Sequence, residues 1–82
     1  MAITADLLEA RYKETFEQET MGLVRRRQAD PNYKIEDLEG ALKHLYIREG
    51  ANLDGRGSLQ DTILSATIAA YEQYIVNWRS QV

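Results

Sequence analysis

The chain has 82 residues and a formal net charge of −3, and its 44% hydrophobic and 28% charged residues predict one folded domain over residues 1–82. The absence of cysteine excludes disulfides and thiolate-bound metal sites, and a single histidine, His44, cannot form a multi-histidine site, so we expect no metal and no cofactor. The acidic balance argues against a dedicated nucleic-acid binder.

The first predicted helix covers about residues 4–29. Thr4 can cap its free backbone N–H groups, and three consecutive arginines at 25–27 suit the negative end of its dipole. Pro31 disfavours helical geometry at Asp30 and ends the helix. Helical spacing places one apolar stripe on the side expected to face the core: Ala5, Leu8, Tyr12, Phe16 and Leu23. A sparser row on the opposite side is a candidate second contact face: Ile3, Leu7, Ala10 and Met21.

The second predicted helix covers about residues 34–49. It follows a turn at residues 30–33, where proline presets the backbone and asparagine tolerates turn geometry. Its apolar residues form a compact arc: Ile35, Leu38, Leu42, Leu45 and Tyr46. His44 lies away from that arc, so we expect it to be exposed to solvent.

Glycine, asparagine and aspartate over residues 50–57 predict a loop. Ser58, with Asp61 three residues later, approximates a capping box and predicts a third helix that runs to about residue 79.

The third predicted helix is apolar around more than half of its circumference. One side carries Leu59, Ile63, Ala66, Ala70, Tyr74 and Trp78, and Leu64, Ile68, Tyr71 and Ile75 extend it. A helix with so wide an apolar arc is buried on several sides. Two neighbouring helices cannot cover all of this surface, so a second chain is the expected partner for the remainder.

These elements predict an all-α three-helix bundle. Short connections favour antiparallel neighbours, which makes up-down-up the simplest topology. The third helix should be the most buried element.

The surplus apolar surface predicts a non-catalytic interaction or assembly module, preferably a twofold homodimer formed through the first and third helices, although another protein could also be the partner. The expected interface residues are Leu64, Ile68, Tyr71, Ile75, Trp78, Ile3, Leu7 and Met21. Trp78 has an alternative role, which is to pack against the end of the first helix.

A second hypothesis is a small ligand-binding domain that uses the 50–58 loop. Against a calcium-binding EF-hand loop, Asn52 and Asp54 match ligand positions 3 and 5, but Gly50 stands where position 1 needs an anionic ligand. The loop also leads into a helix N-terminus, where N–H groups favour a phosphate or carboxylate. The candidate ligand residues are Asn52, Asp54, Arg56 and Ser58. A plain connector, with Ser58 as a helix cap, explains the same residues.

The remaining sequence features give no positive indication of nucleic-acid binding, catalysis or membrane insertion. Residues 25–27 point about 100° apart on a helix, so the three arginines do not form one basic patch. No serine–base arrangement or carboxylate pair is recognisable, and three short helices seldom supply a catalytic pocket, so we expect no enzyme and no catalytic residues. No apolar run is long enough to cross a bilayer, and the N-terminus does not resemble a signal peptide, which favours a cytoplasmic protein without a membrane partner.

Overall fold

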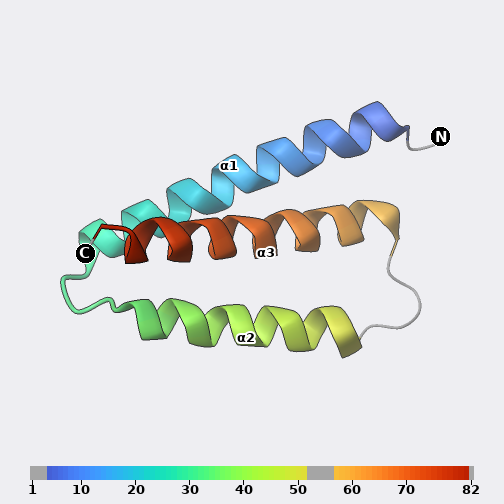
Figure 1. Ribbon diagram of the computed structural model, residues 1–82. Helices are drawn as coiled ribbons and strands as arrows, with labels where there is room; N and C mark the ends of the chain where they lie inside the picture. The colour runs from blue at the N-terminus through green and yellow to red at the C-terminus, as the bar shows by residue number, and fades with distance from the viewer. Residues whose placement is uncertain (1–3, 52–56, 82) are drawn as a thin grey trace.

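The computed structural model describes residues 4–51 and 57–81, and all of its regular structure in these ranges is helical (Figure 1). The helices are α1 (Ala5–Ala29), α2 (Ile35–Ala51) and α3 (Ser58–Arg79). α1 and α3 run in the same direction and α2 runs in the opposite one (Figure 1). The predicted all-α, up-down-up fold is therefore confirmed.

Local side-chain contacts set the two ends of α1. The hydroxyl of Thr4 accepts a hydrogen bond of 3.1 Å from the backbone N–H of Leu7, as an N-cap does. After the helix, the Asp30 carboxylate accepts a bond of 2.9 Å from the N–H of Asn32, and the Asp30 carbonyl accepts one of 3.0 Å from Tyr33. Both contacts close the predicted turn.

The ends of α2 and α3 differ slightly from expectation. The Asp37 carboxylate accepts a hydrogen bond of 3.0 Å from the N–H of Lys34 and so caps the start of α2, which continues through Gly50 to Ala51. The predicted Ser58 cap is wrong. Gly57 is the N-cap of α3 in an extended conformation, and no side chain caps that position. Extended backbone at Gly57 lets the helix begin with Ser58 itself.

α3 lies between the other two helices (Figure 1). It packs against both α1 and α2, whereas the backbones of α1 and α2 do not come close to each other among the described residues. The expectation that the helices joined by the short turn would be neighbours is not met. The reason is that α3 carries apolar side chains on two sides, so each of the other helices packs on its own side of α3.

The core is a cluster contributed by all three helices: Leu23 of α1, Leu38 and Leu42 of α2, and Ile68 and Ile75 of α3. α3 adds two further buried residues, Ala66 and Ala70. It is the most buried element, as predicted.

The central position of α3 gives an elongated molecule that measures 45 × 25 × 21 Å along its principal axes. Its radius of gyration is 14.2 Å, whereas a compact chain of this length has about 12 Å. It exposes 5994 Å² of surface, about 1000 Å² more than a compact monomer of this mass.

Candidate interaction surface

Two of the predicted interface residues belong to the core of a single chain. Ile68 and Ile75 are only 7% and 6% exposed, and both pack in the cluster that includes Leu38 and Leu42. The expectation that they form free surface is wrong. Because α3 is covered from two opposite sides, its wide apolar arc needs no second chain at these positions.

Trp78 is engaged at the end of α1. The Arg27 guanidinium lies 3.8 Å from the centre of the Trp78 ring, and the same arginine donates a hydrogen bond of 3.2 Å to the Gln81 side chain. Tyr74 meets the indole edge-on at 6.0 Å, and Tyr33 lies 6.2 Å from it. Trp78 therefore packs against the end of α1, which was its alternative role.

The three arginines at the end of α1 have separate environments. Arg25 is exposed, Arg26 lies 6.0 Å from the Tyr33 ring, and Arg27 covers Trp78. The expectation that they form no common basic patch is confirmed.

A groove of about 450 Å³ opens beside the N-terminal half of α3. It is lined by Glu19, Leu45, Arg48, Gln60, Ile63, Leu64 and Thr67, which come from all three helices. Leu64 is a predicted interface residue and is half-buried here. Tyr71, also half-buried, has a pKa raised above its usual value, first by burial and then by the negative charge of Glu19. The flank of α3 that carries Leu64 and Tyr71 is thus incompletely covered.

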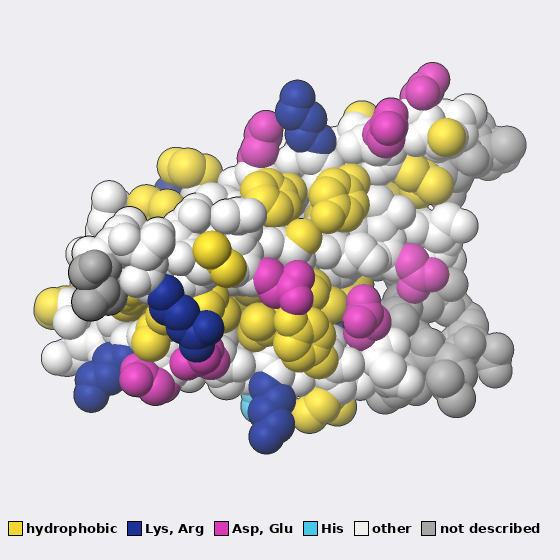
Figure 2. Space-filling model, in the orientation of Figure 1, with side chains coloured by type: hydrophobic (Ala, Val, Ile, Leu, Met, Phe, Trp, Pro, Cys, Tyr) yellow, Lys and Arg dark blue, Asp and Glu magenta, His cyan; other side chains and the backbone are white. Residues whose placement is uncertain are grey.

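A second groove, also of about 450 Å³, separates α2 from α3. Leu42, Tyr46, Ile75 and Val76 form its apolar part, and Glu39, Lys43, Glu72 and Arg79 complete the lining. Two contacts join its walls: the Tyr46 hydroxyl donates to Glu72, and Arg79 pairs with Glu39. The bond to Glu72 is the main reason that the pKa of Tyr46 is raised. Figure 2 shows hydrophobic side chains gathered along the middle of the face that Figure 1 presents.

Val76 is the most exposed residue of this second groove, at 59%. It was missed by sequence reasoning, because it follows the core residue Ile75 and shares a side of α3 with the polar Glu72. The apolar side chain of Val76 was the only feature of the sequence that could have identified it as a candidate surface residue.

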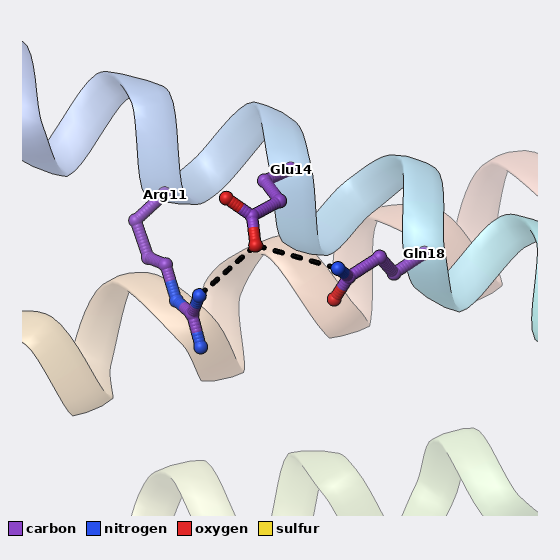
Figure 3. Close-up of polar contacts among 3 residues, drawn as sticks. All are labelled: Arg11, Glu14 and Gln18. Atoms are coloured by element: carbon purple, nitrogen blue, oxygen red, sulfur yellow. Dashed lines mark hydrogen bonds and ion pairs between the residues drawn. The ribbon is translucent and has the colours of Figure 1, made fainter.

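The outer side of α1 carries the exposed apolar pair expected from the sequence. Leu7 is 51% and Met21 49% exposed. Between them, Glu14 accepts hydrogen bonds from Arg11 at 3.1 Å and from Gln18 at 3.3 Å (Figure 3). A shallow depression of about 240 Å³ beside Met21 is bounded by Glu17, Gln18 and Arg25. Of the other two members of the predicted row, Ala10 is exposed and Ile3 lies outside the described residues.

The structure does not test the hypothesis that the 50–58 loop binds a ligand. Asn52, Asp54 and Arg56 lie outside the described residues, and Ser58 is exposed as the first residue of α3. In the described part of the chain, histidine and carboxylate side chains form no group of three that could hold a metal ion. His44 is exposed, as predicted.

No protein-family model, curated protein or solved structure matches this chain. Within residues 4–51 and 57–81, none of the helices combines the length and apolar character needed to cross a membrane.

Proposed function

We propose that the chain is a non-catalytic protein–protein interaction module that associates with a second copy of itself through α1 and the adjoining flank of α3. The observation that carries this proposal is the one-sided packing of α1. Among the described residues, the backbone of this 25-residue helix comes close to α3 but not to α2, and the side turned away holds Leu7 and Met21, each about half exposed.

The exposed area supports the same proposal. Each partner in a protein–protein interface of standard size buries about 800 Å². The chain exposes about 1000 Å² more than a compact monomer of its mass, which is enough for one such interface. Small domains without disulfides often gain stability from association, and this chain has no cysteine.

Catalysis is not part of the proposal. Both grooves are open, and four of the five polar side chains that line the second one bind each other across it: Tyr46 with Glu72 and Arg79 with Glu39. These contacts hold α2 on α3 and explain the polar residues without any chemical step.

The test is the molar mass in solution, measured by sedimentation equilibrium over micromolar to millimolar concentration. We expect a mass that rises toward twice the 9.4 kDa of one chain. Met21→Glu should weaken the association, because it places a charge in an interface that buries an apolar side chain.

Ile47→Glu on α2 is the matched control, because Ile47 is 58% exposed and lies away from α1. Its association should equal that of the unaltered chain. A chain that stays monomeric at every concentration would overturn self-association.

A further inference from the structure

We draw no further inference here: the strongest candidate, the groove between α2 and α3 with its exposed Tyr46 and Val76, carries nothing, because its two acidic and two basic lining residues balance and nothing in the structure shows what covers it.

Discussion

The two helices that flank α3 are held to it in different ways. On the α2 side, the contact is made by large aliphatic side chains, with Leu38 and Leu42 packed against Ile68 and Ile75. Ala66 and Ala70 lie about halfway around α3 from Ile68, on the side where α1 packs. The buried residues of α1 are Thr15 and Leu23. On the α1 side, the small residues at positions 66 and 70 of α3 are thus accompanied by larger contacts, those of Leu23 in the core cluster and of Arg27 with Trp78.

The contacts of α1 and α2 with α3 therefore differ both in the size of the side chains they bury and in their length. Burial of a leucine or isoleucine contributes about 1.5–3 kcal/mol, and an alanine buries much less apolar area. Small residues compensate by letting two helices approach closely over a long distance, and the contact of α1 with α3 is the more extensive one. α2 is thus held mainly by aliphatic side chains, and α1 by a longer contact that combines small residues with Leu23 and with the stacking of Arg27 on Trp78.

The largest effect is expected from Leu38→Ala, which removes a fully buried side chain from the α2 contact. The lost burial and the cavity should lower the free energy of unfolding by about 2–5 kcal/mol. Urea denaturation followed by circular dichroism measures this. Ile47→Ala on the outer side of α2 should change stability by no more than about 0.5 kcal/mol. Equal losses in the two variants would contradict an aliphatic α2 contact.

Ala70→Leu tests the other contact. A leucine has no room at this fully buried position, so α1 must move away from α3, at a cost of about 1–3 kcal/mol of unfolding free energy. The matched control is Ser65→Leu, which adds a leucine at an exposed position of the same helix. Should both variants unfold at the same urea concentration, the close approach of α1 to α3 would be refuted.

Sequence reasoning found the helices because their ends have local causes. Thr4 caps α1 with its own side chain, and the Asp30 carboxylate with Pro31 forms the turn, so a few consecutive residues were enough. The predicted N-cap of α3, Ser58, is displaced by one residue from the observed one, Gly57, because glycine can also serve as an N-cap.

The arrangement of the helices could not be predicted in the same way. Periodicity shows that α3 has a wide apolar arc, but it does not show which helix covers it, so Ile68 and Ile75 were assigned to a second chain. Thr15, buried at 5% exposure, was also missed. The residue type and spacing of a small polar residue do not indicate burial, which follows only from the close approach of the neighbouring helix.

The candidate interface was partly predictable. Leu7 and Met21 were found because their row lies opposite the core stripe, a property of the helix alone. The cluster between them was overlooked, although Arg11, Glu14 and Gln18 have the i,i+3 and i,i+4 spacing of side chains that interact on a helix.

A smaller effect is expected at alkaline pH. Burial raises the pKa of Tyr71, on the α3 flank near α1, and the pKa of Tyr46 is raised mainly by its hydrogen bond to Glu72. The fold thus favours the neutral phenol over the phenolate. This contribution is complete below pH of about 10, the unfolded value, and is lost as the pH rises through the folded pKa.

Tyr71→Phe should therefore lose less stability than the unaltered chain between neutral and alkaline pH. Urea midpoints measured across this range give the comparison, with Tyr12→Phe, at an exposed position of α1, as the control. An identical alkaline loss in the Tyr71→Phe variant would show that burial of this phenol does not contribute.

The smallest effect is expected from Arg27→Lys at the end where α1, α3 and the turn meet. Lysine keeps the charge but cannot stack a planar group on Trp78 while it donates to Gln81, so about 0.5–1 kcal/mol of unfolding free energy should be lost. Arg25→Lys, at an exposed position of the same helix, is the control. If only Arg27→Lys lowers stability, the contact of α1 with α3 is reinforced at its C-terminal end by the guanidinium. If neither does, Tyr33 and Tyr74 suffice to hold the indole, and the guanidinium adds nothing to the contact of α1 with α3.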